Sequence, residues 1–401
     1  MEFETAFSRR DVLRADLSHR GTGFGKEAFT GNHDFCFGIE EEYFLSDAET
    51  LQIPAETPDS LFETARHETG GRIAREFLQP QVEVATVPHS DPAEVRSDLL
   101  RLRQTAAAAA AQHGFTILAA GTHPTGRWRK VEQTPGERYS AVMEGLQMIG
   151  QRNMLCGMHV HVEFPDPDRR VDVMARMLPY VPLFLALSTS SPFWESRSTG
   201  LKGYRLAAYD ELPRTGLPEL FRTTEEYESY VAALVNSGVM EDSSYVWWSI
   251  RPSHKYPTLE LRAPDCCTRV YDALAIAALY RALVRHLYLS TGSKFDVETV
   301  DRAIAVENKW RAQRYGVQGT FVTRDGAITV GEMLERVIDD ISGDAAVLGC
   351  EAELAHCRGI IAAGTSADAQ LAIFHARAAE DGEETALHAV ARWIAAETVK
   401  A

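Results

Sequence analysis

The chain has 401 residues, of which 45% are hydrophobic and 24% charged, a composition that suits a globular protein with a large core. Its formal net charge of −16 argues against nonspecific binding to nucleic acid or to an anionic membrane. An anionic small substrate is not excluded, because arginines and bound cations can reverse the local field inside a cleft.

The predicted elements begin after an N-terminal arm, residues 1–31, which is polar and contains glycine. Two arginines in this arm faintly resemble a twin-arginine export signal, but no apolar segment follows them. The most apolar later segment, residues 178–187, carries two prolines and is too short to span a bilayer. The six cysteines include no zinc-type CxxC pair and are predicted to be reduced thiols. We therefore expect a soluble, cytoplasmic protein.

Strand patterns and helical periodicity alternate from residue 35 onward. The predicted strands cover residues 35–45, 81–86, 115–120, 156–164, 246–250 and 258–263. The predicted helices cover residues 92–113, 135–150, 170–190, 224–237, 271–291 and 299–312. After about residue 328 the pattern is wholly helical. Mixed strands followed by helices favour an α+β fold with an antiparallel sheet.

The first predicted strand contains three consecutive glutamates, Glu40, Glu41 and Glu42. Successive side chains of a strand point to opposite faces, so Glu40 and Glu42 share one face, about 6–7 Å apart. Two carboxylates in a partly buried place repel each other and lose hydration, and a cation, an arginine or a shared proton must offset that cost. We expect Glu40 and Glu42 to face a cleft, and Glu41 to have a structural partner such as an arginine.

Three later strands repeat this division into an apolar face and a face with charged or metal-binding side chains. These side chains are Glu83 in the second strand, His159, His161 and Glu163 in the fourth, and Glu260 and Arg262 in the last. A polar sheet face in water explains any one strand, but it explains all four less well because such faces are usually rich in Lys, Thr and Gln. Carboxylates with one or two imidazoles suit hard cations such as Mg²⁺, which can bridge phosphate oxygens in phosphoryl transfer.

His159 and His161 also form an H-x-H pair, which is a familiar zinc pair in metal-dependent amidohydrolases. The pair alone leaves hydrolysis and ligation open, and the nearby glutamates favour a hard-metal site with one of the two histidines as a ligand. Arginines in motif-like segments offer bidentate binding of carboxylate or phosphate, above all Arg262, which shares a face with Glu260. The sequence has no P-loop and no dinucleotide GxGxxG motif, so a nucleotide would bind in another way.

Together these segments resemble the type-2 glutamate–cysteine ligase-like carboxylate–amine ligases, a family related to glutamine synthetase. The matching segments lie between about residues 35 and 320 and are FGIEEEYFL, EFLQPQVEVAT, AAGTHP, ERY, NMLCGMHVHVEF, SPFWESRSTGLKGYR, WWSIRPS, TLELRAPDCCT and ENKWRAQRYG. The resemblance implies a curved, mostly antiparallel sheet that forms an active-site funnel, with helices packed on its outer face. It also implies one catalytic domain over residues 32–401, with a helical portion from about residue 328.

The reaction that the resemblance implies joins a carboxylate to an amine. ATP phosphorylates the carboxylate, typically the γ-carboxylate of glutamate, and the amine of cysteine or of another molecule attacks the acyl phosphate. ATP and Mg²⁺, with Mn²⁺ as an alternative, would be the cofactors, the partners would be small molecules, and a homo-oligomer is compatible with the family.

The resemblance also assigns roles to single residues. The implied metal ligands are Glu40, Glu42, Glu83, His159 and Glu260, with Glu76 as an alternate. Arg262 and Glu260 are the implied catalytic residues, and Arg262 would steady the transferring phosphoryl group. Contacts with substrate or phosphate are implied for Arg205, Arg251 and Arg314. Two other functions stay open: a zinc-type metallohydrolase that uses His159 and His161, and a catalytically idle family member that binds nucleotide.

Overall fold

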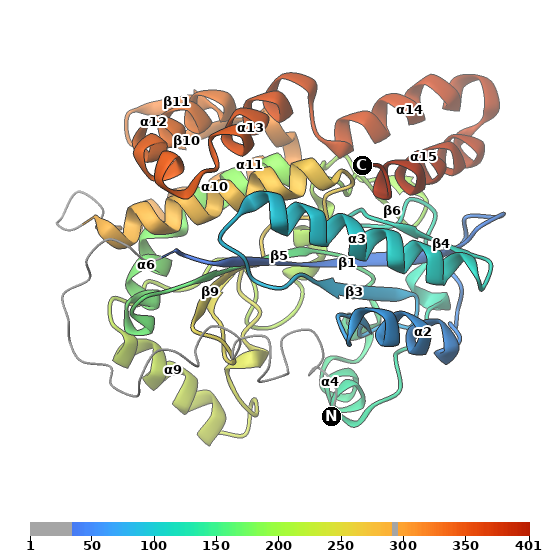
Figure 1. Ribbon diagram of the computed structural model, residues 1–401, viewed down its shortest axis with the longest axis horizontal. Coiled ribbons are helices and arrows are strands. Elements are labelled where there is room, and N and C mark those ends of the chain that lie inside the picture. Colours follow the sequence, from blue (N-terminus) through green and yellow to red (C-terminus); the bar gives the residue numbers. More distant parts are fainter. Residues whose placement is uncertain (1–33, 291–295) are drawn as a thin grey trace.

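The computed structural model describes residues 34–290 and 296–401 (Figure 1). The predicted arm of residues 1–31 lies outside the described residues. The main sheet is antiparallel throughout its described pairs, with the order β2-β3-β1-β5-β9-β8 and β4 beside β1. Its strands are β1 (Phe37–Asp47), β2 (Ile73–Arg75), β3 (Gln81–Ala85), β4 (Phe115–Leu118), β5 (Met158–Glu163), β8 (Ile250–Pro252) and β9 (Thr258–Leu261). Two hairpins stand apart from it, formed by β6 (Phe193–Trp194) with β7 (Arg197–Ser198), and by β10 (Thr320–Thr323) with β11 (Gly326–Thr329).

Helices lie on both sides of this sheet. They are α2 (Asp59–Thr69), α3 (Pro92–Ala111), α4 (Glu137–Leu146), α5 (Met148–Gln151), α6 (Arg170–Met177), α7 (Val181–Ser188), α8 (Tyr204–Tyr209), α9 (Thr224–Asn236), α10 (Val270–Leu289), α11 (Thr299–Tyr315), α12 (Val330–Leu348), α13 (Glu351–Ala363), α14 (Ser366–Asp381) and α15 (Glu383–Thr398). In the view of Figure 1, α10 to α15 lie above the sheet, and α4 and α9 lie below it. The predicted α+β class, with a helical C-terminal portion, is confirmed.

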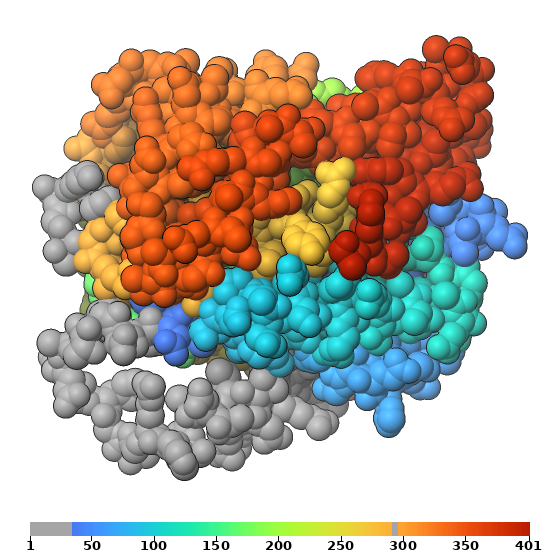
Figure 2. Space-filling model, turned by 45° about the horizontal axis from the view of Figure 1, so that its top comes forward, coloured from blue at the N-terminus to red at the C-terminus, as the bar shows by residue number. Residues whose placement is uncertain are grey.

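The apolar face of the sheet is covered by α3 and α10. On β1 this face is formed by Phe37, Ile39, Glu41, Tyr43 and Leu45, all of which are fully buried. Figure 2 shows the outside of this helical layer, where the C-terminal helices, orange to red, adjoin the cyan and blue-green α3. The packing leaves the opposite face of the sheet available for a cleft.

The sequence of α3 explains its position and length. Asp91 caps the helix by accepting a hydrogen bond from the Ala93 amide at 2.8 Å, and Pro92 occupies the first turn, where no backbone N–H is needed. The chain leaves the helix before Gly114, whose φ of 76° is readily adopted only by glycine. Arg103 in the middle of α3 forms a fully buried ion pair with Glu41 of β1. The expectation that Glu41 has an arginine partner is therefore confirmed.

Some predicted boundaries are wrong. Residues 246–249 are not a strand, because the amides of Trp247 and Ser249 bond to the carbonyls of Arg214 and Gly216 in a neighbouring loop. The predicted helix over 135–150 is divided into α4 and α5 at Gln147, whose φ is 53°. The predicted helix over 170–190 is also divided, and a 3₁₀ turn that contains Pro179 separates α6 from α7.

The apolar segment around α7 is longer than the sequence suggested. The helical stretch Pro167–Ser188 has 22 residues and is long and apolar enough to cross a membrane, which corrects the expectation based on residues 178–187 alone. However, 78% of its most apolar window is buried inside the protein. Such burial is typical of a core helix in a soluble protein.

Candidate functional site

A cavity of about 590 Å³ lies over the polar face of the main sheet. Strands β1, β3, β5, β8 and β9 supply its floor, and side chains from α4, α8 and the β8–β9 turn supply its walls. Ten of the residues singled out in the sequence line it, namely Glu40, Glu42, Glu76, Glu83, His159, His161, Arg205, Arg251, Glu260 and Arg262. The alternation of side chains along four strands brings seven of them together as predicted, whereas Glu76 lies between β2 and β3, Arg205 comes from α8 and Arg251 comes from β8.

Strand register determines which of these side chains are neighbours. Glu42 of β1 is paired with Glu83 of β3, and Glu40 is paired with His159 of β5. On the next row, His161 is paired with Glu260 of β9, and Glu260 is paired with Arg251 of β8. Residues directly opposite each other on adjacent strands have Cβ atoms about 4.5–5.5 Å apart, so the register alone concentrates the charges.

Glu40 lies between the two imidazoles. His159 Nδ1 is 3.5 Å from Glu40 Oε2, and His161 Nε2 is 3.5 Å from Glu40 Oε1. Burial by itself would raise the pKa of Glu40, but His161 and His159 outweigh it and lower that pKa. Burial likewise opposes charge on His161, yet the Glu40 carboxylate raises the pKa of this histidine overall. Glu40 and His161 thus favour each other's charged forms, and the His161 imidazole must lose its proton before it can bind a cation.

Glu76 and Glu83 lie close to Glu42, and neither forms an ion pair with an arginine among the described residues. Burial, followed by the charge of Glu42, raises the pKa of Glu76 to about 8. Burial, followed by the charge of Glu40, raises the pKa of Glu83 well above its usual value. Such shifts mean that the folded chain does not by itself compensate all the negative charge in this part of the cavity.

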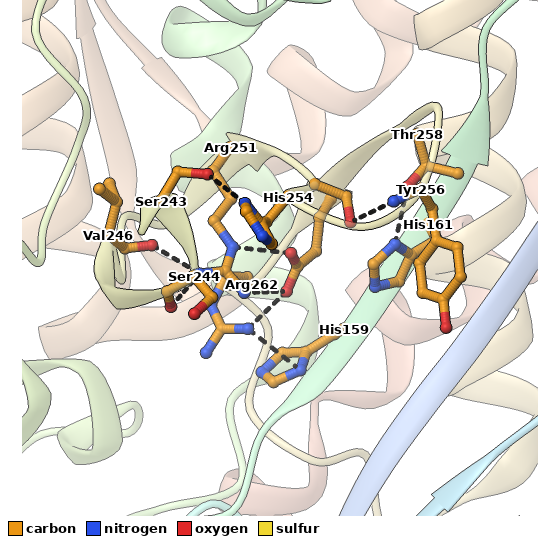
Figure 3. Close-up of polar contacts among 12 residues, drawn as sticks. His159, His161, Ser243, Ser244, Val246, Arg251, His254, Tyr256, Thr258 and Arg262 are labelled. Atoms are coloured by element: carbon orange, nitrogen blue, oxygen red, sulfur yellow. Dashed lines mark hydrogen bonds and ion pairs between the residues drawn. The ribbon is translucent and has the colours of Figure 1, made fainter. Parts of the chain in front are cut away.

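Glu260 has the opposite environment, because two arginines enclose it. Figure 3 shows these two arginines, Arg251 and Arg262, with Arg262 close to His159. Arg251 donates from Nε to Glu260 Oε2 at 2.7 Å and from Nη2 to Oε1 at 3.2 Å, and Arg262 Nη1 also donates to Oε1. Burial would raise the pKa of Glu260, but the two guanidinium groups lower it well below its usual value. Arg262 also reaches His159 Nδ1 at 3.4 Å, which connects this group with the histidine pair.

The two remaining predicted arginines, Arg205 and Arg314, lie in different environments. Arg205 of α8 is buried against the floor, with its guanidinium hydrogen bonded to the backbone carbonyls of Arg262 and Pro264. Arg314 is exposed on α11, stacks over Tyr315 at 5.0 Å and is not among the residues lining the cavity. The expected contact of Arg314 with substrate in this cavity therefore has no geometric basis in the described residues.

Several lining residues were not predicted from the sequence. They are Tyr139, Val142 and Leu146 of α4, Tyr209 of α8, Trp247, and the turn residues His254, Lys255 and Tyr256. The Tyr256 ring meets the His161 ring edge-on at 6.1 Å between centroids. The segments ERY and GYR belong to the matching motifs and lie at or near α4 and α8, so they were a signal for these two helices. No local pattern shows which loop lies over which strand, so the other lining residues could not be predicted.

The donor set fits a divalent cation. One ligand atom each from Glu40, His161 and Glu260 lies within 4.8 Å of the other two. His159 Nε2 is buried, has no hydrogen-bond partner among the described residues, and faces Glu42 Oε1 at 3.9 Å. Carboxylate oxygens and neutral imidazole suit Mg²⁺ or Mn²⁺. The geometry adds His161 to the predicted ligands. Glu260, which is also a predicted ligand, already accepts hydrogen bonds from two arginines.

The sequence matches the model of glutamate–cysteine ligase family 2 over residues 36–388. A protein of Bradyrhizobium sp. (strain ORS 278), provisionally named glutamate–cysteine ligase 2, is 59% identical over 366 residues, which are 91% of this chain and 88% of the relative. A protein of Rhodospirillum rubrum with the same provisional name is 43% identical over 372 residues, 91% of this chain and 96% of the relative.

Two solved structures share the fold. A glutamate–cysteine ligase from Francisella tularensis in complex with AMP superposes with a TM-score of 0.68 at 13% identity, covering 91% of this chain and 89% of the other. A bifunctional glutathione synthetase from Pasteurella multocida gives a TM-score of 0.64 at 16% identity, covering 90% of this chain and 52% of the other. At these identities the likeness concerns the arrangement of helices and strands.

Proposed function

Since the chain belongs to glutamate–cysteine ligase family 2, we propose that it joins the γ-carboxylate of glutamate to an amine, that of cysteine or of another molecule. Membership makes it an ATP-dependent enzyme that forms C–N bonds. What we propose is the identity of the substrates and of the cations, and the role of each residue in the cavity. The observation that carries it is the set of carboxylates, imidazoles and arginines from five strands under one cavity of about 590 Å³.

The reaction we propose has two steps. An oxygen of the substrate carboxylate attacks the terminal phosphorus of ATP, and the bond to the bridging oxygen breaks so that ADP leaves. The amine nitrogen then attacks the carbonyl carbon of the acyl phosphate, phosphate leaves, and the amine gives up a proton. Little covalent chemistry is asked of the protein, so positioning and charge stabilisation account for most of its contribution.

The carboxylates of Glu40, Glu42 and Glu83, with an imidazole of β5, would hold Mg²⁺ or Mn²⁺. Such an ion, when bound, offsets the negative charge of phosphate oxygens. Arg262 is held beside this set by its contacts with Glu260 and His159. In this proposal its guanidinium stabilises the charge that develops on the phosphoryl group. Glu260 is then best described as the residue that holds Arg262 and Arg251, with ligation as a second role.

A screen for ADP release tests this function. Purified protein with ATP and Mg²⁺ is offered glutamate and other carboxylates, each crossed with a panel of amines that includes cysteine. We expect ADP release only when both a carboxylate and an amine are present. Hydrolysis of amides with Zn²⁺ and indifference to ATP would instead favour the metallohydrolase that the His159 and His161 pair suggested. Nucleotide binding without turnover across the whole panel would favour a catalytically idle member. A cytoplasmic location and a homo-oligomeric state remain predictions.

A further inference from the structure

Helix α4 covers the cavity without being packed into the core. Among the α-helices of the described residues, it alone contains no buried residue. A helix usually buries its apolar side against the core, whereas the half-buried side of α4 faces a cavity with a charged floor. This side consists of Arg138, Tyr139, Val142, Met143 and Leu146, and all of these except Met143 line the cavity.

The chain is fixed on both sides of α4 but not between. Before the helix, Thr134 is buried, and it donates from its amide to the Phe77 carbonyl at 2.9 Å and from its hydroxyl to the Glu76 carbonyl at 2.5 Å. After the helix, Gly150 is buried in α5. Residues 135–149 between these two points include no buried residue. Since little burial opposes its movement, this segment can open locally at low cost in free energy.

The C-terminal end of α4 has the backbone geometry of a hinge. Gln147 ends the helix with φ 53° and ψ −131°, a conformation that side chains other than glycine adopt only with strain. Its amide still donates to the Met143 carbonyl at 2.7 Å, so the strain lies where the helix stops. A rotation at Gln147 would relieve this strain and swing α4 away from the cavity, as hinge residues at the ends of elements do.

A contact across the cavity holds α4 in place. Arg138 Nη2 donates to Ser244 Oγ at 2.9 Å, and the Arg138 guanidinium carbon lies 4.7 Å from the ring centre of Tyr245. The Ser244 carbonyl in turn accepts a hydrogen bond from Arg251 Nη1 at 2.9 Å (Figure 3). Because Arg251 is bonded to Glu260, the wall that receives Arg138 is fixed to the floor. We call the contact between Arg138 and Ser244 the latch.

The proposed reaction needs protection from water. A water oxygen can attack the carbonyl carbon of the acyl phosphate in place of the amine. Phosphate then leaves, the water gives up a proton, and the carboxylate substrate is re-formed, so that ATP is consumed without an amide. Tyr139, Val142 and Leu146 line the cavity from the side of α4, and their largely apolar surface excludes water from the charged floor while α4 stays in place.

We propose that α4 is a lid over the cavity, and that the latch between Arg138 and Ser244 determines whether the amine or water reacts with the acyl phosphate. The lid follows from the contacts of α4, whereas its effect on the choice between amine and water rests on the proposed ligase function. Arg138 acts in this proposal through the position of α4.

Hydrogen exchange tests the lid without any substrate. In Arg138→Met, the amides of α4 should exchange about 10-fold faster than in the wild type, because loss of a hydrogen bond from a charged group shifts an equilibrium by at least this factor. The amides of α3 should be unchanged, which shows that the variant is folded. The matched control is Arg392→Met, at an exposed position of α15. Unchanged exchange of α4 in Arg138→Met would overturn the lid.

The ratio of ADP released to amide formed tests the choice between amine and water. In the wild type this ratio should be about 1, with little ADP released when glutamate is offered without an amine. Arg138→Met should release ADP without an amine about 10-fold faster than the wild type, and its ratio should rise. Slower turnover at an unchanged ratio would overturn the proposal, since it would mean that Arg138 contacts a substrate instead. A wild type that releases no ADP with any amine, while α4 still exchanges faster in Arg138→Met, would refute the proposed function and support the lid.

Ser244 allows the latch to be broken from the opposite wall. Ser244→Ala removes the same hydrogen bond but keeps the Arg138 charge in the cavity, so it should raise the ratio as much as Arg138→Met does. The double variant should go no further, because both changes break one contact. Ser244→Thr, which keeps the hydroxyl, should restore the ratio of the wild type. Additive effects of the two changes, or a Ser244→Thr variant that behaves like Ser244→Ala, would contradict the latch.

Discussion

The two faces of β1 give glutamate side chains opposite environments. On the core face of β1, Glu41 accepts hydrogen bonds from Arg103 Nη2 at 2.6 Å and Nε at 2.9 Å and from the Tyr43 hydroxyl at 2.6 Å. On the cavity face, Glu40 and Glu42 meet imidazoles at 3.5–3.9 Å and no arginine among the described residues. The chain compensates the charge that it uses for structure, and leaves for a ligand the charge that we propose it uses for function.

Arg103, the partner of the structural carboxylate Glu41, also joins distant parts of the chain. Besides Glu41, Arg103 donates to the carbonyl groups of Cys267 and Thr268 at 2.8 Å each, and to that of Thr398 at 3.2 Å. One guanidinium group thus connects β1, the segment before α10 and the end of α15. Removing its acidic partner would leave a buried cation inside the core.

The largest expected effect follows from breaking this pair. Glu41→Gln should lower the free energy of unfolding by about 3–5 kcal/mol, because an uncompensated Arg103 stays buried. Urea denaturation of the wild type and the variant measures the difference. Protein that still folds should keep its activity per molecule, since Glu41 does not face the cavity. A loss below about 1 kcal/mol would mean that the two faces are not as different as the contacts indicate.

The matching change on the other face is Glu42→Gln. We expect ADP release to fall about 100- to 1000-fold, because Glu42 is a proposed ligand of the cation that offsets the charge of the phosphoryl oxygens. Stability should change by less than about 1 kcal/mol, since relief of repulsion offsets the weakened hydrogen bond from the Gly157 amide to Glu42. Near-normal turnover would contradict the assignment of Glu42. Together the two variants separate stability from activity at neighbouring positions of one strand.

The sequence was sufficient to predict which side chains of a strand share a face, and this explains why seven residues from four strands meet in the cavity. A strand has a period of two, so Glu40, Glu83, His159 and Glu260 could be assigned locally. Arg314 does not line the cavity, because the position of α11 depends on packing that no local pattern encodes. The hydrogen bond from the Ser191 hydroxyl to Asp265 was not visible from the sequence for a similar reason, since it joins residues far apart in the chain.

A smaller effect concerns the metal ion. Mg²⁺ at about 100 times its Kd should stabilise the wild type by about 2–3 kcal/mol, since it binds only the folded chain. Thermal unfolding in Mg²⁺ and after removal of the ion by EDTA measures this difference. The Glu42→Gln variant should lose most of it, while Glu41→Gln, though less stable, should keep it. Equal stabilisation of both variants would place the ion away from the cavity face of β1.

The smallest effect concerns His123, a buried polar group that the chain satisfies internally near the end of β1. Its Nε2 lies 2.7 Å from Ser46 Oγ, and burial, followed by the charge of His388, lowers its pKa to about 3. Since the unfolded pKa is about 6.5, the folded state favours the neutral ring. The resulting contribution to stability is complete above pH 6.5 and declines as the pH falls toward 3.

We expect His123 to lower the free energy of unfolding by about 2 kcal/mol between pH 7 and pH 5. His123→Asn should unfold with a flatter pH dependence, measured by urea denaturation at both pH values. An unchanged slope would show that other groups determine the acid sensitivity.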